Sequence, residues 1–375
     1  MSLRSKITWS ILLLILFFGS LASISTYYLT KKEFTAQVAK DLEGNTVALS
    51  HEIYQILRQS RDIAKAISND SLVRAYVSSE KSTPAQSDII LDEFSGYNLG
   101  NMYSALYVLD LKGKTVISTD PRFLGQDYSF RDYFMSAVKG EPFTSVAIGV
   151  TSNELGYYFS HPIYDPKDDT KIAGVAVAKL KPENIESALL NHLTTGYDIY
   201  LTDKHGVIIL PSDSDKYLHS LGPLSESSHK ELINSNAYNQ KNFKSLDYGV
   251  FMDEIQNGYE DSKIEQIKDD HDNKDELIAL SKVKDFPFYI MFEGDMTIID
   301  RVSIKSSLII AGYVLIAAIL SVIIILIIVQ IFLNQQQIVE QKLLEKTNDL
   351  EKLNKLMVGR EIKMIELKKE LINKS

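Results

Sequence analysis

Two long uncharged apolar runs constrain the fold of this chain more than any other feature. Residues 7–28 and residues 307–333 contain no Asp, Glu, Lys or Arg. A hydrocarbon core of about 30 Å needs roughly 20 helical residues to cross it, so each run is long enough. We therefore predict transmembrane helices at residues 7–28 and 306–333, with a cleaved signal peptide as the alternative for the first.

Basic residues outside the two runs predict the topology of the chain. Arg4 and Lys6 precede the first run, and Lys342 and Lys346 follow the second. Cytoplasmic flanks of membrane spans are enriched in Lys and Arg, so both termini are predicted to be cytoplasmic, although Lys31 and its neighbour weaken this prediction. The predicted protein is a two-pass protein of the inner membrane. Its predicted segments are a cytoplasmic N-terminus (1–6), the first span (7–28), an extracytoplasmic domain (29–305), the second span (306–333) and a cytoplasmic tail (334–375).

Composition excludes several classes of function. The net charge of −9 over 375 residues leaves no basic surface for nucleic acid. The absence of cysteine excludes disulfides, thiolate metal sites and cysteine nucleophiles. The run Asp269–Asp272 is interpreted as a solvated loop rather than a metal site. With no nucleophile–base pair in view, we expect neither an enzyme nor a bound metal or cofactor.

The tail carries an apolar repeat of seven residues. With Leu343 at position a, every a position to the end of the chain is apolar. Three of the five d positions are apolar, namely Val339, Leu353 and Leu367, and the other two are Lys346 and Arg360. The pattern predicts a parallel two-stranded coiled coil and thus a homodimer, with a single solvated helix as the alternative.

No catalytic histidine motif or nucleotide-binding glycine motif follows residue 333. We therefore expect any output to pass through a separate signalling protein such as a histidine kinase. An adaptor protein, or a sensor kinase that has lost its kinase, are the alternatives.

The segment between the runs begins with residues of helical periodicity over 29–70 and then changes to strand patterns. Residues 104–119 read as a hairpin, and three further strand patterns follow before residue 181. A five-stranded antiparallel sheet with a helix at 131–140, between strands two and three, accounts for this order. The predicted class is α+β.

The hairpin pattern recurs at residues 197–212, and residues 275–294 supply two closing strands. This predicts a second, similar module. The distal module is placed at about 90–185 and the proximal module at about 190–298. Residues 213–274 carry no pattern that assigns them.

Three motifs of the first module resemble the membrane-distal half of double Cache (PDC) sensor domains, in particular those of C4-dicarboxylate sensor histidine kinases. They are Phe130-Arg131-Asp132-Tyr133-Phe134, the segment Gly149–Ser160 and Lys179 at the end of an apolar strand. The resemblance implies two PAS-like antiparallel-sheet modules on a long N-terminal helix. Two departures stand out: Val150 replaces a threonine of the family pattern, and no kinase follows the second run.

The resemblance implies a ligand pocket in the distal module. Arg131 offers a planar fork for a carboxylate, and Lys179 would be costly to bury unless an anion pairs with it. Tyr157 and Tyr158 alternate across a strand, so only one is expected to face the ligand. The candidate ligand-binding residues are Tyr128, Arg131, Tyr133, Thr151, Ser152, Tyr157, Tyr158 and Lys179.

Two cations favour a small dicarboxylate as the ligand. An α-amino acid, the alternative, needs an acidic partner for its ammonium, and Asp127, Asp132 and Glu154 are the candidates. We further expect Tyr128 and Arg131 to lie one turn apart on the same face of a helix. The predicted function is a membrane-bound sensory receptor for a small organic anion, with no catalytic activity.

Overall fold

The computed structural model describes residues 3–79, 83–194, 196–246, 248–258, 262–268 and 275–372. The run Asp269–Asp272 lies outside these residues. The chain divides into two compact units, Lys31–Arg301 and the pair of segments Met1–Thr30 and Val302–Ser375.

The first element, α1 (Leu3–Asn69), is a single continuous helix of 67 residues. Beyond residue 40, most buried positions of α1 follow the last by three or four residues, which is the spacing of one face of an α-helix, and Ser50 and Ser68 are buried beside them. The residues with this spacing are Leu42, Thr46, Leu49, Ile53, Leu57, Ser60, Ala64 and Ile67. The helix predicted over 29–70 is confirmed, as part of this longer element.

The distal module is built on a five-stranded antiparallel sheet in the order β2-β1-β5-β4-β3. In chain order its strands are β1 (Tyr103–Leu109), β2 (Thr115–Ser118), β3 (Phe143–Ile148), β4 (Leu155–Asp165) and β5 (Asp168–Leu180). The 3-10 turn η1 (Pro121–Phe123) and helix α4 (Asp132–Ala137) lie between β2 and β3 in the chain. The predicted sheet and its inserted helix are confirmed.

The proximal module repeats this sheet in the equivalent order β7-β6-β10-β9-β8. Its strands are β6 (Tyr197–Asp203), β7 (Ile208–Pro211), β8 (Ser262–Lys268), β9 (Asp275–Lys282) and β10 (Phe288–Asp295). The segment that the sequence left unassigned contains η2 (Ser214–Lys216), α6 (Glu226–Asn234), α7 (Gly249–Gln256) and β8.

Matching turns fix the correspondence between the modules. The Asp110 carboxylate accepts hydrogen bonds from the backbone N–H groups of Lys112 and Lys114. The Asp203 carboxylate accepts the same pair of bonds, at 2.9 Å each, from His205 and Val207. Each aspartate thereby closes the hairpin between the first two strands of its sheet, as aspartates commonly do in turns.

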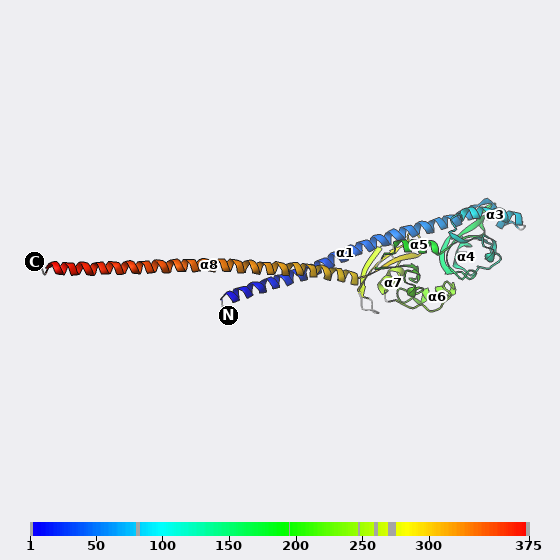
Figure 1. The fold of residues 1–375 in the computed structure, drawn as a ribbon. Helices are drawn as coiled ribbons and strands as arrows, with labels where there is room; N and C mark the ends of the chain where they lie inside the picture. The colour runs from blue at the N-terminus through cyan, green and yellow to red at the C-terminus, as the bar shows by residue number, and fades with distance from the viewer. Residues whose placement is uncertain are drawn as a thin grey trace. The chain divides into compact units, whose positions relative to one another are not determined.

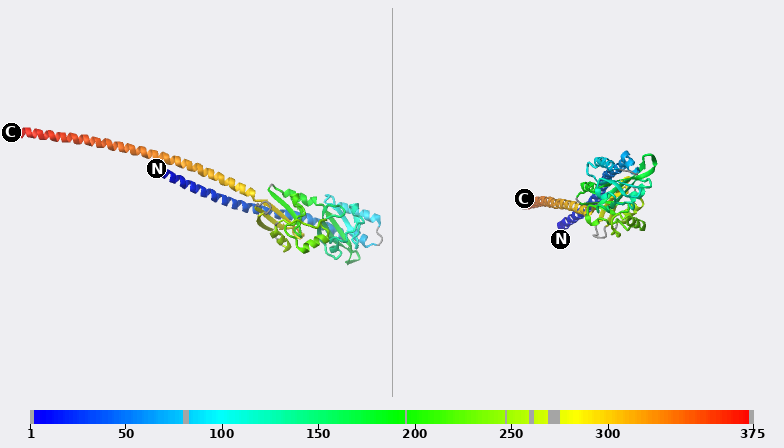
Figure 2. Two further views of the ribbon diagram at one scale, coloured as in Figure 1. Left: turned by 90° about the horizontal axis from the view of Figure 1, so that it is seen from below. Right: turned by 90° about the vertical axis from the view of Figure 1, so that its right-hand side faces the viewer.

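The two faces of the distal sheet pack differently. One face joins α1 in a core that continues into the proximal module. The helices α2 (Ser71–Ser78), α3 (Pro84–Tyr97) and α5 (Glu183–His192) complete the unit, and α3 lies at the end remote from α7 (Figure 1). In the left-hand view of Figure 2 the two modules follow one another along α1. The opposite face of the distal sheet forms a separate cluster with η1 and α4, and this face holds the candidate site.

The second unit contains parts of the two helices that are long and apolar enough to cross a membrane, α1 and α8 (Thr297–Ile372). Within it, the Ser307 hydroxyl donates to the carbonyl of Ser23 at 2.9 Å. A Cβ at Gly19 would approach Val314 Cγ1 to 2.6 Å, so this position favours a residue without a side chain.

Candidate ligand-binding site

A row of side chains crosses the open face of the distal sheet at its centre. Lys179 on β5 lies opposite Ala105 of β1 on one side and opposite Tyr158 of β4 on the other. Tyr158 in turn lies opposite Ser145 of β3. Residues directly opposite one another on neighbouring strands point to the same face of a sheet. These four side chains therefore share the face that η1, α4 and the β3–β4 loop cover.

Lys179 is the buried cation of this face, with 1% of its surface exposed. Its Nζ donates to Ser152 Oγ at 2.6 Å and lies 5.6 Å from the ring centroids of Phe123 and Tyr158. Burial lowers its pKa to about 8, an effect that the nearby Glu154 partly offsets. Among the described residues, no carboxylate comes within 4.0 Å of its ammonium. A buried ammonium without a counter-ion is costly, so the site is suited to an anion.

Arg131 is the second buried cation, with 3% of its surface exposed. One guanidinium nitrogen donates to the Ile148 carbonyl at 2.9 Å. The other donates to the carbonyls of Ser235 and Asn236, both at 3.4 Å, which belong to the proximal module. In the part of the chain that the structure describes, Arg131 forms no ion pair with an acidic side chain.

The prediction that Tyr128 and Arg131 lie one turn apart on the same face of a helix is wrong. Arg131 is the N-cap of α4 and has an extended backbone, with φ −79° and ψ 138°. Its N–H instead donates to the Tyr128 carbonyl at 3.0 Å in a turn that precedes the helix. Because Arg131 precedes the first turn of α4, its side chain reaches the Ile148 carbonyl of β3 instead of lying on a face of the helix.

A group of tyrosines forms the remaining wall of the site. The hydroxyls of Tyr107 and Tyr133 are 2.8 Å apart, and the Tyr133 and Tyr158 rings stack at 5.1 Å. Tyr128 and Thr151 are joined by a hydrogen bond of 2.6 Å. Burial raises the pKa of Tyr133 and of Tyr158, so these phenols stay protonated and can donate to an anion.

Tyr157 does not join the other candidates. It lies on the opposite face of the sheet, fully buried in the core shared with α1, where its ring meets Phe288 edge-on at 5.6 Å. Its hydroxyl has no hydrogen-bond partner among the described residues. The structure thus brings together seven of the eight predicted residues: Tyr128, Arg131, Tyr133, Thr151, Ser152, Tyr158 and Lys179.

Two glycines make room for the lysine. A Cβ at Gly156 would lie 2.5 Å from Lys179 Cε, and one at Gly149 would lie 3.1 Å from its Nζ and 2.8 Å from the Tyr158 hydroxyl. Real Cβ atoms essentially never approach another atom within 3.0 Å, so a side chain at Gly156 would displace Lys179, and one at Gly149 would displace Ser152 and Tyr158. The glycines of the β3–β4 segment are therefore part of the site.

Two residues of the site were absent from the sequence prediction. Tyr107 and Phe123 pack against each other, with ring centroids 5.5 Å apart, on the face that holds Lys179. The alternation of Ala105 and Tyr107 along β1 could have indicated the face of the tyrosine. The position of Phe123 depends on a packing contact distant in sequence, and no local pattern predicts it. The void lined by Arg131 has a volume of about 10 Å³, roughly the space of one water molecule.

The corresponding place in the proximal module is occupied by the chain itself. Glu293 pairs with Asp198, and Lys179 pairs with Ala105. Asp198 and Ala105 each lie five residues before the hairpin aspartate of their sheet, so Glu293 and Lys179 occupy corresponding positions. The ammonium of Lys216 meets the two Glu293 oxygens at 2.9 and 3.1 Å and donates to the Tyr200 hydroxyl at 2.8 Å.

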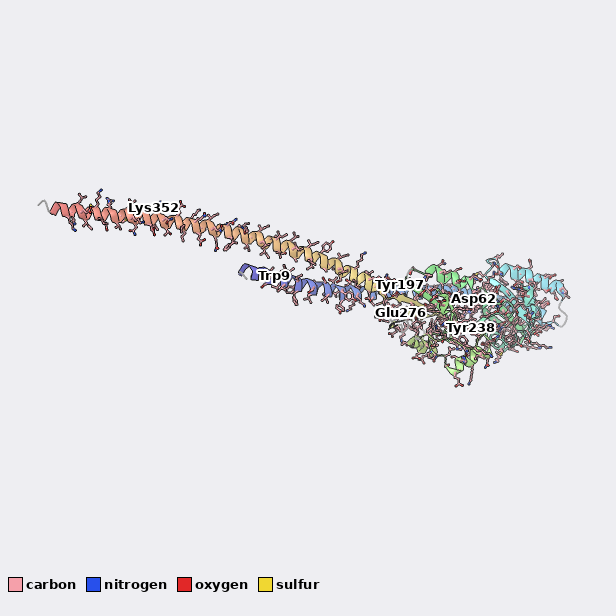
Figure 3. All side chains as sticks on the ribbon, turned by 60° about the horizontal axis from the view of Figure 1, so that its bottom comes forward. Trp9, Asp62, Tyr197, Tyr238, Glu276 and Lys352 are labelled. Atoms are coloured by element: carbon pink, nitrogen blue, oxygen red, sulfur yellow. The ribbon has the colours of Figure 1, made fainter. Side chains whose placement is uncertain are left out.

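A further buried carboxylate completes this proximal cluster. The Tyr248 hydroxyl donates to both Glu276 and Glu293 at 3.2 Å, and both glutamates are less than a tenth exposed. Figure 3 shows Glu276 within the globular part of the unit Lys31–Arg301. An internal ion pair therefore neutralises Glu293 in the proximal module, whereas no carboxylate of the described residues pairs with the distal cations, so the distal face is the candidate binding site.

Comparison with known proteins agrees with this architecture. A family model for the Cache domain matches residues 30–301. The C4-dicarboxylate transport sensor protein DctB of Pseudomonas aeruginosa is 30% identical over 131 residues, and that of Rhizobium meliloti is 32% identical over 113 residues. These alignments cover 34% and 29% of this chain, and 20% and 17% of the two relatives, so the chain matches about a fifth of their length.

Among solved structures, the sensor domain of the V. cholerae histidine kinase DctB superposes with a TM-score of 0.56 at 21% identity. That superposition covers 69% of this chain and 98% of the sensor domain. The likeness extends over both sheets, which fits two Cache modules in series. The chain therefore belongs to the Cache domain family, with a double Cache sensor domain that resembles the one of DctB.

Proposed function

We propose that this protein is a membrane-bound sensory receptor that binds a small organic anion, a C4-dicarboxylate, in the distal module. One observation carries the proposal: two buried cations, Lys179 and Arg131, share one face with neutral phenols, and no described carboxylate pairs with either. Two fixed cations are complementary to a short molecule with a carboxylate at each end. The name of the DctB relatives supports the same class of ligand.

The arrangement fits binding rather than catalysis. Lys179 and Arg131 supply charge, and Tyr128, Thr151 and Ser152 supply hydroxyls around them. At this face the Ser152 hydroxyl accepts a hydrogen bond from the Lys179 ammonium, and the protonated amine is a charge partner for an anion rather than a general base. A ligand of four carbons needs more space than the small void at Arg131, so binding would require the β3–β4 loop, residues 149–154, to move outward.

Titration of the full chain in detergent with succinate tests the ligand class. We expect succinate, malate or fumarate to raise the melting temperature, and butyrate, with one carboxylate, to bind at least tenfold more weakly. Lys179→Met should abolish the effect, whereas Lys112→Met, at an exposed hairpin residue of the same module, should retain it. No stabilisation by any dicarboxylate, with the fold preserved, would remove this ligand class.

We also propose that α1 and α8 span the inner membrane and that the α8 tail forms a parallel coiled coil with a second copy. Among the residues whose side chains the structure describes, the apolar seam positions of the tail are at least half exposed in the single chain, including Leu350, Leu353 and Met357. A helix with such a seam is stabilised by pairing. A change in the distal site would then reach a separate signalling protein through α8.

A further inference from the structure

A second cavity lies between the two modules, apart from the Lys179 site. Its volume is about 340 Å³, within the range of cavities that hold small ligands. Residues of α1, α4 and β3 line one side of it, and residues of the β6–β7 hairpin, α6 and the β9–β10 turn line the other. Neither Lys179, Arg131 nor Tyr158 lines it, although it shares Asp132, Ser145 and Val146 with the small void beside Arg131.

Most charges at this cavity are neutralised within the protein. Asp203 accepts two backbone hydrogen bonds and a third, at 2.7 Å, from the hydroxyl of Tyr238, a residue that Figure 3 places within the globular unit. Lys204 forms an ion pair with Glu231, and the His205 ring lies 3.8 Å from the same carboxylate. Asp285 is exposed to solvent at its turn.

Two charges of opposite sign remain. The Arg61 guanidinium lies 5.0 Å over the Phe286 ring and has no carboxylate within 4.0 Å among the described residues. The Asp132 carboxylate likewise has no cation within 4.0 Å there. Burial raises the pKa of Asp132, and the nearby Lys204, Arg131 and His205 offset this effect only in part.

The rest of the lining is apolar and comes from both modules. Phe143 and Val146 of the distal module and Leu232 and Phe288 of the proximal module contribute to it. The cavity therefore offers one carboxylate, one guanidinium and an apolar wall. A ligand that carries an ammonium, a carboxylate and a hydrocarbon group would satisfy all three features at once.

We propose that the cavity between the modules is a second binding site, which takes a small zwitterion of the α-amino acid class with an aliphatic side chain. Asp132 pairs with the ammonium and Arg61 with the carboxylate, while the apolar residues hold the side chain. This site is independent of the dicarboxylate site proposed above. Because its walls belong to both modules, an occupant stabilises their present arrangement.

The test uses the full chain in detergent and L-leucine as the probe. We expect leucine to bind and to raise the melting temperature. Two analogues, 3-methylbutylamine without the carboxylate and 4-methylpentanoate without the ammonium, should each bind at least tenfold more weakly, because each leaves one partly buried charge unpaired. Equal binding of leucine and either analogue, or no binding of leucine, would overturn the proposal, and neither result requires a variant.

Variants then assign the site. Arg61→Gln and Asp132→Asn should each weaken leucine binding at least tenfold, and Arg61→Gln should leave succinate binding unchanged. Arg58→Gln, one helical turn earlier on α1 and half exposed, is the matched control and should retain leucine binding. Loss of leucine binding in Lys179→Met with retention in Arg61→Gln would instead place the amino acid in the distal site and refute this inference.

Discussion

Tyr157 and Tyr158 are adjacent in the sequence and lie on opposite faces of the distal sheet. The buried Tyr157 hydroxyl has no hydrogen-bond partner among the described residues, whereas Tyr158 stacks on Tyr133 beside Lys179. Removal of an unsatisfied buried hydroxyl is not destabilising, so Tyr157→Phe should leave the free energy of unfolding unchanged or raise it by about 1 kcal/mol. Tyr158→Phe should instead weaken succinate binding. Equal effects of the two changes on binding, measured by titration calorimetry, would contradict the assignment.

The pKa of Lys179 predicts how stability and binding depend on pH. It is about 8 in the folded protein, against a reference value of 10.5. Between these values the unfolded chain holds more protons, so the Lys179 contribution to the free energy of unfolding rises as pH increases from about 8 to about 10.

Ligand binding has the opposite dependence on pH. An anion pairs with the ammonium, so succinate affinity should fall as pH rises through about 8, and binding at pH 8 should take up roughly half a proton. Calorimetry in buffers of different ionisation enthalpy measures this uptake. Lys112→Met should show the same uptake as the unchanged protein, and binding at pH 8 without uptake would mean that Lys179 does not meet the ligand.

Arg131 connects the two modules as well as lining the site. Its guanidinium donates to one distal and two proximal carbonyls, and a lysine cannot reproduce this fork. We expect Arg131→Lys to lower the free energy of unfolding by about 1–3 kcal/mol, because buried carbonyls lose their donors. Chemical denaturation measures the difference. Arg122→Lys, at an exposed arginine paired with Asp120, should change it by less than about 0.5 kcal/mol.

At the scale of the elements, Gly156 of β4 leaves space for the side chain of Lys179 on the neighbouring strand β5. Gly156→Ala should displace the Lys179 side chain and weaken succinate binding at least tenfold, because the added Cβ would fall 2.5 Å from Cε. Gly96→Ala is the control, since a Cβ in that α3 position meets no atom within 4 Å. Alanine is also the better helix former there. Unchanged binding in Gly156→Ala would show that Lys179 is not held as described.

The α8 tail gives a prediction of its own. The side chain of Lys352 extends from a helix that no other described element covers at that point (Figure 3). Leu350→Glu places a charge in the proposed seam and should shift the full chain from dimer toward monomer in sedimentation. Leu344→Glu makes the same change one residue beyond an a position and should not do so. A dimer that survives Leu350→Glu would point to contacts outside the tail.

Elements with a strong local period could be predicted from the sequence. The three- and four-residue spacing of α1, the two aspartate turns and the alternation along β4 each express a local rule. The elements between residues 213 and 268 could not, because α6 and α7 are short and β8 is defined by its pairing with β9. The position of Arg131 depends on carbonyls more than 100 residues away, which no spacing within the motif encodes.

At the scale of the whole molecule, the two sheets carry opposite charges at corresponding positions, Lys179 and Glu293. The proximal glutamate has its counter-ion, Lys216, within the same chain. The distal lysine has none among the described residues. The buried charge of the proximal sheet is therefore paired within the protein, whereas that of the distal sheet would be paired by an anion from solution. If an anion from solution pairs with Lys179, the stability of the distal module depends on the concentration of that anion.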